Sequence, residues 1–460
     1  MHLASGKDLG HLTYCTNIHA GEPLDEVMTG LARHLPAIKA AVAPERQLGV
    51  GLRLGHQAAE GLRDPAALAA LKRFLDEGGY YVFTLNGFPY GAFHGRTVKE
   101  DAYKPDWSEP ARLAYTDHLA DILSALLPAG QDGSVSTVPC TFKPWAEGRM
   151  DAITENLVRH VAHLVGIARK TGQTIALALE PEPCCHLETI DETVAFFKAR
   201  LFARQGVARL AALTGLSSSE AEAATRRHIG VCYDVCHAAV EFEDPKASVA
   251  QLRANGIGIP KLQLSSALKV AALDKRSARH LAAFAEPVYL HQVVQKSNGV
   301  LRRFVDLPQA LAEADGAAGA EWRVHFHVPV FLEQMTHFAT TQAFLAEILR
   351  LHREDPISTH LEVETYTWDV LPEALQAPAT GAAEWRVHFH VPVFLESMGE
   401  LGTTQRDLAG VLDLIKERRH GACLEVETYT WDVLPPEYKA LDMNAAIARE
   451  LAWTRDRLEA

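Results

Sequence analysis

Apolar residues follow two alternating periods along the chain. Short runs rich in β-branched and apolar residues are typical of strands, and the longer stretches between them carry apolar positions three and four apart, as amphipathic helices do. The predicted strands are Leu12–Ile18, Leu48–Leu54, Tyr80–Leu85, Val135–Cys140, Thr174–Leu179, Ile229–Tyr233, Lys261–Leu264 and Leu361–Thr367. The predicted helices include Leu24–Val42, Asp64–Glu77, Trp107–Leu127, Met150–Lys170, Asp191–Arg204 and Pro245–Ala254. This alternation predicts an α/β fold, a (β/α)8 TIM barrel with a closed parallel sheet.

One region departs from the alternation. Between Leu264 and Leu361 the chain is much longer than one helix requires, and Pro287–Val294 and Glu321–Val330 within it are strand-like. We therefore expect a strand excursion after barrel strand seven, over residues 265–330, at the carboxyl-terminal mouth where barrel active sites lie.

The carboxyl-terminal part of the chain repeats itself. Glu321–Glu333 recurs letter for letter as Glu384–Glu396, and Leu361–Pro372 recurs as Leu424–Pro435, so residues 321–383 and 384–446 form a tandem repeat. A barrel of eight strands has one position for its last strand, so one copy of this strand–helix–strand block is expected to be surplus.

Which copy closes the barrel stays open at this stage. The second copy is followed by the long amphipathic segment Tyr438–Leu458, which favours it, whereas the first copy lies nearer to strand seven in the sequence. When one copy of the repeat is set aside, the remaining length suits one domain. We therefore expect residues 1–460 to form a single elaborated barrel rather than several domains.

Composition narrows the function classes. The chain has 45 Lys and Arg against 58 Asp and Glu, a net charge of −13, and no long basic run, which disfavours nucleic acid as a partner. It shows no signal peptide and no apolar stretch of membrane-spanning length, so we expect a cytoplasmic protein without a membrane span. Seven cysteines scattered through apolar segments indicate reduced thiols.

Carboxylates stand at the ends of three predicted strands. Strand alternation places Glu180 inward at the barrel mouth with Glu182 just above it, Asp234 at the end of another strand, and Glu362 and Glu364 on one face of the last. So much negative charge in one mouth is costly unless a cation offsets it. The pattern predicts a divalent metal ion, Mn²⁺, Mg²⁺, Co²⁺ or Zn²⁺, against the alternative of ordinary surface acids.

Histidines supply a second signal. His325 and His327 lie on one face of their predicted strand, where they either complete a metal site, bind substrate hydroxyls or form the solvent face of a hairpin. Cys232 and Cys236 have a spacing that zinc sites use, but on an extended strand their thiols lie too far apart to converge easily on one ion.

Several motifs resemble a known superfamily. The runs ALEPEP (Ala178–Pro183), GVCYDVCHA (Gly230–Ala238) and LEVETYTW (Leu361–Trp368) resemble the xylose-isomerase-like barrels, which include sugar and sugar-phosphate isomerases, ketose epimerases and the endonuclease IV type of repair enzyme. More closely, motifs along nearly the whole chain resemble the EboE family of metabolite traffic proteins. These are HLTYCTNIHAGE (His11–Glu22), NGFPYGAFHG (Asn86–Gly95), VKEDAYKPDW (Val98–Trp107), STVPCTFKP (Ser136–Pro144), KLQLSSAL (Lys261–Leu268), VYLHQVV and WRVHFHVPVFLE.

The resemblance implies roles for particular residues. The metal ligands fall on Glu180, Asp234 and Glu364 or its copy Glu427, while the strand-seven ligand, usually histidine, falls on Gln263. An amide oxygen is a weaker ligand than an imidazole nitrogen. His237, or His325 with His327, would then supply the missing histidine ligand. Glu180 with Glu364 or Glu427 would be the catalytic proton shuttles. The expected substrate-binding residues are His237, His325, His327, His388, His390, Asn86, His94 and Lys143.

Three functions remain in competition. The first is a metal-dependent isomerase or epimerase acting on a polyhydroxylated or cyclitol-like small molecule. The second is a non-catalytic protein that binds a metabolite and passes it to a transfer partner in an export pathway. The third, an endonuclease IV-like phosphodiesterase, is favoured by His56, His94 and the Asp234–His237 spacing and opposed by the net charge and Gln263.

Overall fold

A computed structural model describes most of the chain. The described residues are 2–4, 8–13, 16, 21–92, 97–285, 287–314, 319–328, 333–335, 337–363, 393–394, 396–398, 401–417, 422–425 and 443–459.

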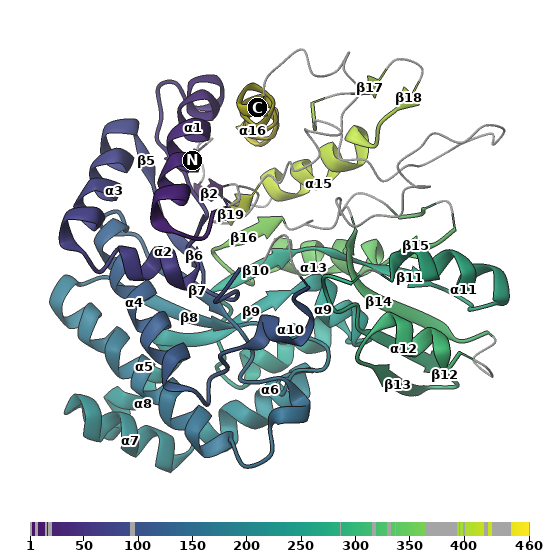
Figure 1. Ribbon diagram of the computed structural model, residues 1–460, viewed down its shortest axis with the longest axis horizontal. Coiled ribbons are helices and arrows are strands. Elements are labelled where there is room, and N and C mark those ends of the chain that lie inside the picture. The colour runs from purple at the N-terminus through teal and green to yellow at the C-terminus, as the bar shows by residue number, and fades with distance from the viewer. Residues whose placement is uncertain are drawn as a thin grey trace.

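Parallel strands form the curled wall of an α/β barrel (Figure 1). Seven of them are hydrogen-bonded in the order β16-β10-β9-β8-β7-β6-β4, and β3 pairs with β5 in parallel. After β2, Thr16 N donates to Gly51 O (2.9 Å), which joins the first strand to the second. The wall strands are β2 (Asp8–Thr13), β3 (Leu48–Gly49), β4 (Leu52–Arg53), β5 (Tyr80–Tyr81), β6 (Thr84–Asn86), β7 (Gly133–Thr137), β8 (Ile175–Leu179), β9 (Ile229–Asp234), β10 (Lys261–Leu264), β16 (Leu361–Val363) and β19 (Ala422–Glu425). The α/β barrel expected from the alternation is confirmed in this coarse form.

Helices cover the outside of the wall. Local signals explain their ends: Asp64 caps α3 and Ser217 with Glu220 forms a capping box on α8, while Gly79, Gly172 and Gly215 end helices with positive φ. The helices of the barrel layer are α1 (Leu24–Val42), α2 (His56–Gly61), α3 (Pro65–Gly78), α4 (Pro110–Leu126), α5 (Met150–Thr171), α6 (Ile190–Phe196), α7 (Arg204–Thr214), α8 (Ser218–His228), α9 (Val235–Val240), α10 (Pro245–Ala254), α13 (Gln342–Glu354), α15 (Gln405–Glu417) and α16 (Met443–Glu459). The π turn η4 (Phe197–Leu201) continues α6, and the short helical turns η2 (Lys99–Tyr103) and η3 (Lys143–Trp145) follow β6 and β7.

Two of these helices lie where the sequence interpretation assigned no element. The predicted helix Asp191–Arg204 ends with the π turn η4, and α7 and α8 then follow before β9. The apolar pattern did not predict α7 and α8 because each helix has few apolar residues. Each covers the outside of the barrel and buries only one side.

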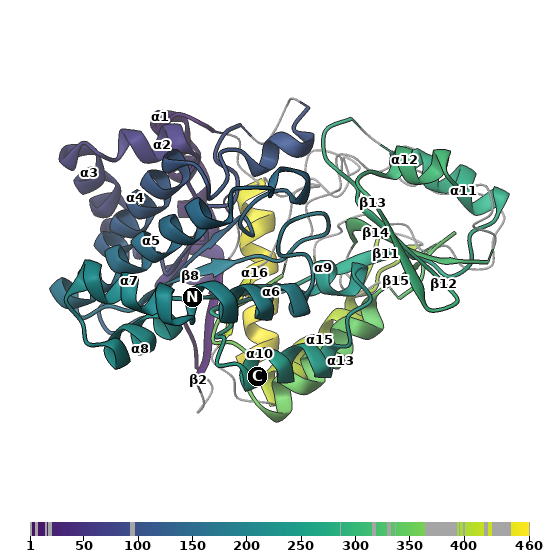
Figure 2. The ribbon, with the colours of Figure 1, turned by 90° about the horizontal axis from the view of Figure 1, so that it is seen from below.

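A second sheet follows β10 in the chain. Its five strands pair antiparallel in the order β13-β12-β14-β11-β15, and we call it the mouth sheet. It has a hydrophobic core of its own around Trp322 and Phe326, and it projects to one side of the barrel (Figure 2). Its elements are β11 (Ser266–Val270), α11 (Lys275–Leu281), η5 (Ala282–Phe284), β12 (Val293–Ser297), β13 (Val300–Phe304), α12 (Leu307–Ala312), β14 (Glu321–Val328) and β15 (Ala339–Thr340).

Both copies of the repeat contribute a strand to the wall. β16, from the first copy, pairs with β10, and β19, from the second copy, pairs with β2. The two strands lie next to each other, and α13 and α15, the equivalent helices of the two copies, also pack together. We expected only one copy in the wall; the difference arises because any parallel strand with the same pattern satisfies the free backbone groups of an edge.

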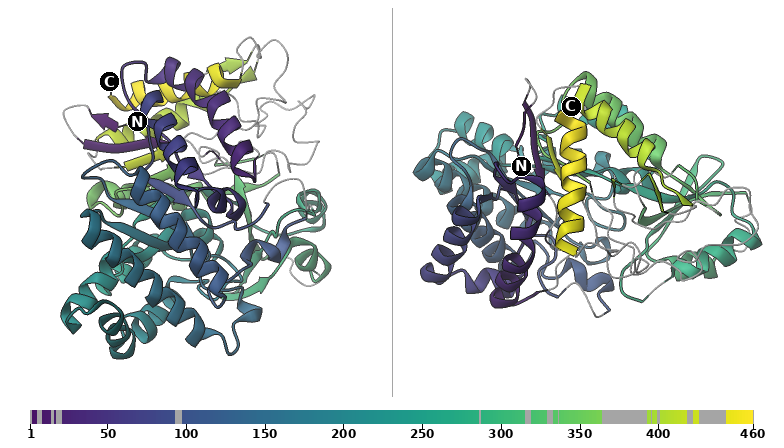
Figure 3. Two further views of the ribbon diagram at one scale, coloured as in Figure 1. Left: turned by 60° about the vertical axis from the view of Figure 1, so that its left-hand side comes forward. Right: turned by 90° about the horizontal axis from the view of Figure 1, so that it is seen from above.

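The last helix completes the outer layer. α16 packs against both α15 and α1. Helices α16 and α1 run side by side (Figure 3). The short strands β1 (His2–Ala4), β17 (Ser397–Met398) and β18 (Leu401–Gly402) lie at the edges of this region. Over the described residues, no helix combines the length and apolarity needed to cross a membrane.

Candidate metal centre

A cavity of about 90 Å³ lies at the carboxyl ends of the barrel strands, beneath the mouth sheet. Barrel strands and their following segments supply Arg53, Asn86, Phe88, Pro89, Lys99, Ala102, Tyr103, Glu180, Glu182, His237 and Gln263. The segment 289–327 of the mouth-sheet region supplies Tyr289, Leu290, His325 and His327. Most of these residues carry polar or charged side chains, and Phe88, Pro89, Ala102 and Leu290 supply apolar wall, so the cavity suits a polar small molecule.

Asp234 is the last residue of β9 and caps α9. Its Oδ1 accepts hydrogen bonds from His237 N and Ser265 Oγ, both at 2.9 Å. Oδ2 is buried and faces no hydrogen-bond donor among the described residues. Although burial opposes ionisation, His237, His327 and these hydrogen bonds hold the pKa of Asp234 below its ordinary value. Asp234 is thus an ionised carboxylate with one oxygen available to a cation.

Three imidazoles converge beside Asp234. His237 lies in the first turn of α9, and His325 and His327 point the same way from β14 because strand side chains alternate. The Nε2 atom of His325 lies 3.0 Å from Nε2 of His237 and 3.3 Å from Nε2 of His327. All three rings are buried.

The opposite ring nitrogens determine which protons these imidazoles carry. His237 Nδ1 lies 3.0 Å from Pro181 O, and a carbonyl oxygen only accepts, so Nδ1 carries the hydrogen. His325 Nδ1 lies 2.7 Å from Gln292 Oε1, and Gln292 Nε2 faces the Pro183 carbonyl at 3.2 Å, which fixes the orientation of that amide. In their neutral forms, His237 and His325 therefore direct two bare Nε2 lone pairs at each other.

Such an arrangement is repulsive unless a cation lies between the nitrogens. Burial together with His237, His327 and His291 lowers the pKa of His325 well below its ordinary value, so His325 itself does not supply that cation by taking up a proton. A histidine that donates its other N–H to a carbonyl or amide oxygen is also the usual arrangement around metal ligands. The residues present therefore fit a metal ion.

Glu182 stands at the same mouth with a different environment. Tyr103 Oη donates to Glu182 Oε1 (2.8 Å), and Gln292 Nε2 donates to Tyr103 Oη (2.9 Å). Burial raises the pKa of Glu182, against the opposing influence of His237, Tyr103 and Gln292. Asp234 and Glu182 are thus two buried carboxyl groups whose surroundings move their pKa values in opposite directions, a pattern found in acid–base sites.

Three sets of donor atoms lie within 4.8 Å of one another: Asp234 with His237 and His327, Glu182 with His237 and His325, and Cys236 with His325 and His327. Imidazole with carboxylate suits Zn²⁺, Mn²⁺, Fe²⁺ or Co²⁺. The three imidazoles are shared among the sets, so the described residues offer one centre rather than several.

Several residues expected from the sequence meet here. Asp234, His237, His325 and His327 each belong to at least one of the overlapping donor sets, although no single set holds all four, and Glu180, Gln263 and Asn86 line the same cavity. Glu180 is buried at the end of β8, outside the three sets of donors. Gln263 accepts a hydrogen bond from the Cys232 thiol (3.1 Å). Because the chain turns into α9 directly after Asp234, Cys236 reaches the cluster from a helix and not from the strand that we expected.

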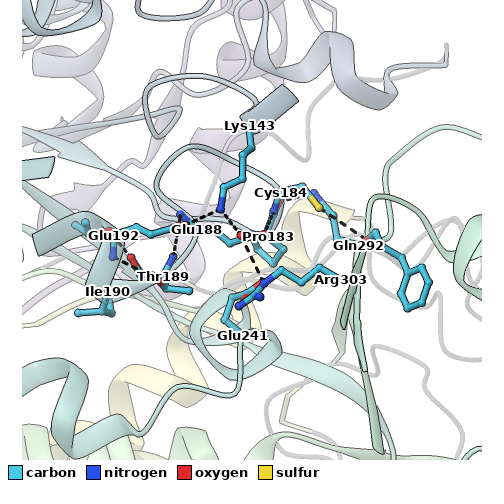
Figure 4. Close-up of polar contacts among 12 residues, drawn as sticks. Lys143, Pro183, Cys184, Glu188, Thr189, Ile190, Glu192, Glu241, Gln292 and Arg303 are labelled. Atoms are coloured by element: carbon cyan, nitrogen blue, oxygen red, sulfur yellow. Dashed lines mark hydrogen bonds and ion pairs between the residues drawn. The ribbon is translucent and has the colours of Figure 1, made fainter. Parts of the chain in front are cut away.

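Other expected residues lie elsewhere. Lys143 does not line the cavity; it forms ion pairs with Glu188 and with Glu192 (2.8 Å) on the outer side of the mouth (Figure 4). His56 stacks on Tyr90, with ring centroids 4.4 Å apart, and does not join the cluster. The catalytic and binding predictions for Glu364, Glu427, His94, His388 and His390 fall outside the described residues.

Sequence reasoning missed part of the site. Alternation placed Glu182 just above Glu180 at the mouth, but it was assigned no role in the site. Tyr103 and Gln292 carry no such signal, because they meet Glu182 only through the packing of η2 and the mouth sheet on the barrel.

Comparisons with known proteins do not narrow the class of protein beyond what the fold and the site define. No protein-family model and no curated protein matches the chain. Similar solved structures include the IolI protein with a bound zinc atom, at 12% identity over 97% of this chain and 98% of its own, with a TM-score of 0.36. A xylose isomerase-like TIM barrel protein from Mycobacterium smegmatis in complex with magnesium has 10% identity over 98% and 96%, TM-score 0.35. A D-tagatose 3-epimerase-like protein has 14% identity over 55% and 75%, TM-score 0.33.

Similarity at this level supports no functional argument. The class of protein is defined by its own structure, an α/β barrel with a histidine–carboxylate cluster at the carboxyl ends of the strands.

Proposed function

We propose that this chain binds a divalent metal ion through Asp234, His237, His325 and His327 and acts on a small polar metabolite as an isomerase or epimerase. Glu180 and the strand-eight glutamate, Glu364 or Glu427, are the proposed proton-transfer groups. Gln263 lines the site as a neutral hydrogen-bonding residue, and His237 and the two mouth-sheet histidines replace it as ligands.

The spacing of the imidazole nitrogens carries the proposal. Two nitrogens about 2.1 Å from one ion, at angles between about 90° and 110°, lie about 3.0 to 3.4 Å apart. The two observed separations, 3.0 Å and 3.3 Å, fall in this range, and the hydrogen bonds to Pro181 O and Gln292 leave the lone pairs of His237 and His325 directed inward.

The residues around the cavity define what they would do in the reaction. A bound divalent ion polarises a carbonyl or hydroxyl oxygen of the substrate. Glu180 is a buried strand-end carboxylate on the cavity wall, suited to remove the proton from the adjacent carbon. Burial raises the pKa of Glu182 at the same mouth, which favours its protonated form, and Phe88, Pro89 and Leu290 form the apolar part of the cavity wall.

The test has two parts. Metal analysis of the purified protein, with chelator competition for Zn²⁺, Mn²⁺ and Co²⁺, measures the centre itself. Incubation of the loaded protein with ketoses and cyclitol ketones in D₂O measures proton abstraction as deuterium at the carbon beside the carbonyl. We expect metal binding in the wild type and in Glu180→Gln, with deuterium incorporation only in the wild type. A folded wild type that binds none of these ions would refute the proposed centre.

Gln263 favours a second candidate function. The superfamily resemblance places a histidine ligand at this position, and here the amide oxygen is occupied by the Cys232 thiol. A barrel with this change can bind a metabolite without converting it, as the resemblance to the EboE family of metabolite traffic proteins implies. Saturable binding of a polyol by the metal-loaded protein, with no deuterium incorporation, would favour this alternative and its transfer partner in an export pathway.

A further inference from the structure

The candidate metal centre is assembled from three separate segments. His325 and His327 belong to the mouth sheet, Asp234 and His237 to the β9–α9 connection, and Glu182 to the loop between β8 and α6. The separation of the imidazole nitrogens therefore depends on how closely these segments are held together.

Arg303, on β13 of the mouth sheet, contacts the other two segments at once (Figure 4). Its Nε and Nη2 atoms lie 2.8 Å and 2.7 Å from Glu241 Oε2, at the end of α9, and Nε lies 3.5 Å from Glu188 Oε2 in the loop before α6. The side chains of Glu241 and Glu188 are 0% and 4% exposed, so both carboxyl groups are shielded from solvent, while the Arg303 side chain is 34% exposed.

Each carboxylate that Arg303 contacts belongs to a segment that carries metal-centre residues. Glu188 Oε1 accepts a hydrogen bond from Cys184 N (2.6 Å), which ties Arg303 to the loop containing Glu182. Glu241 caps the carboxyl end of the short helix that begins after Asp234 and contains His237.

Charge balance makes Arg303 difficult to replace. Lys143 is paired with Glu188 and Glu192, so Arg303 is the cation that faces Glu241 among the described residues. Without it, the buried carboxyl group of Glu241 would lie beside the Glu188–Lys143 pair with no guanidinium facing it, and this cost is relieved by separating the segments or by keeping a proton on Glu241.

Other contacts keep the mouth sheet in place. Arg323 Nη1 donates to Ala239 O (2.6 Å), and an apolar cluster of Cys236, Val240, Ala267 and Val294 joins α9 to β11 and β12. Loss of Arg303 is therefore expected to loosen the docking of the sheet rather than to unfold it.

We propose that Arg303 is a positioning residue of the metal centre, which holds the histidines of the mouth sheet against α9 and the Glu182 loop at the spacing that one ion requires. This inference rests on the proposed function. Arg303 itself lies on the outer side of the junction and does not line the cavity.

Arg302 provides a matched control. It is the neighbouring residue on β13, it points to the other face, and it pairs with Glu313 and lies over the Phe304 ring (4.6 Å) within the mouth sheet itself. Its side chain is 55% exposed. Arg302→Gln removes the same charge without touching the barrel.

The experiment compares R303Q and R302Q in the full chain. We expect R303Q to lose at least tenfold in Zn²⁺ affinity by chelator competition and to change the visible spectrum of the Co²⁺-loaded protein, while R302Q stays within twofold. R303K, which keeps a charge, and the double variant R303Q/E241Q, which removes both, should each recover part of the affinity. A merely structural role would lower the melting temperature without changing the cobalt spectrum.

The inference is overturned if R303Q has wild-type affinity and spectrum, or if R302Q is equally impaired. Amide hydrogen exchange of residues 321–328 in the metal-free proteins supplies a readout that needs no metal. R303Q should exchange faster than R302Q and wild type, and equal rates would overturn the docking role. A wild type that binds no metal refutes the proposed function, whereas the exchange measurement still decides whether Arg303 holds the sheet.

Discussion

Replacing His325 with leucine tests the central geometric claim. The substitution keeps an apolar group of similar size in a buried position but removes the Nε2 atom that lies 3.0 Å from His237 and 3.3 Å from His327. Loss of a residue that merely orients a ligand costs 10- to 100-fold in metal affinity, so loss of a ligand should cost at least about 100-fold, or about 2.8 kcal/mol.

The effect on stability differs between the loaded and the metal-free protein. At a Zn²⁺ concentration about 1,000 times the wild-type Kd, binding stabilises the fold by about 4.1 kcal/mol, and a 100-fold weaker site retains about 1.4 kcal/mol. In the metal-free protein, the His325→Leu substitution removes the repulsion between the facing Nε2 lone pairs of His237 and His325. It also removes the hydrogen-bond partner of Gln292 Oε1, which costs about 1 kcal/mol of folding free energy. We therefore expect a much smaller zinc-induced rise in melting temperature and little change in the metal-free protein.

Chelator competition and thermal melting with and without Zn²⁺ measure both quantities. His291→Leu is the control, because His291 is buried nearby and hydrogen-bonds the His325 carbonyl (3.1 Å) but belongs to none of the three donor sets. Wild-type zinc affinity in the His325 variant, or an equal loss in the His291 variant, would refute the reasoning.

Three further changes give independent expectations. Asp234→Asn should lower Zn²⁺ affinity at least about tenfold, because the ionised ligand becomes neutral; equal affinity by chelator competition contradicts the assignment. Tyr103→Phe removes the hydroxyl shared by Glu182 and Gln292 and should lower the free energy of unfolding, measured in urea, by about 1 to 3 kcal/mol. An unchanged free energy of unfolding would show that this hydrogen-bond network is not formed. Burial and Glu188 raise the pKa of Glu241 to about 8, so its contribution to stability is present at low pH and is lost as the pH rises from about 4.5 to 8, by up to about 1.4 kcal/mol per pH unit. Glu241→Gln should flatten this slope in urea unfolding at pH 5.5 and 7.5, and an unchanged slope would exclude Glu241 as its source.

The sequence by itself determined the elements of the barrel. The bounds of α1, α10 and β10 follow directly from apolar spacing, because the periods of 3.6 and 2 are properties of local backbone geometry. The same alternation predicted that Glu180 stands inward at the end of its strand, and Asp234 lies at the end of β9 as expected. Local periodicity thus identified the barrel carboxylates without any knowledge of their neighbours.

The tertiary structure decided which of these groups form a centre. His237 and His325 are 88 positions apart in the sequence, and Tyr103 and Gln292 are 189 apart, so their contacts depend on how the mouth sheet docks on the barrel. The repeat likewise supplies one strand from each copy, and only the pairing of β16 with β10 and of β19 with β2 distinguishes their places. Periodicity describes which face a side chain occupies, whereas the distance between two faces is set by the packing of segments remote in the chain.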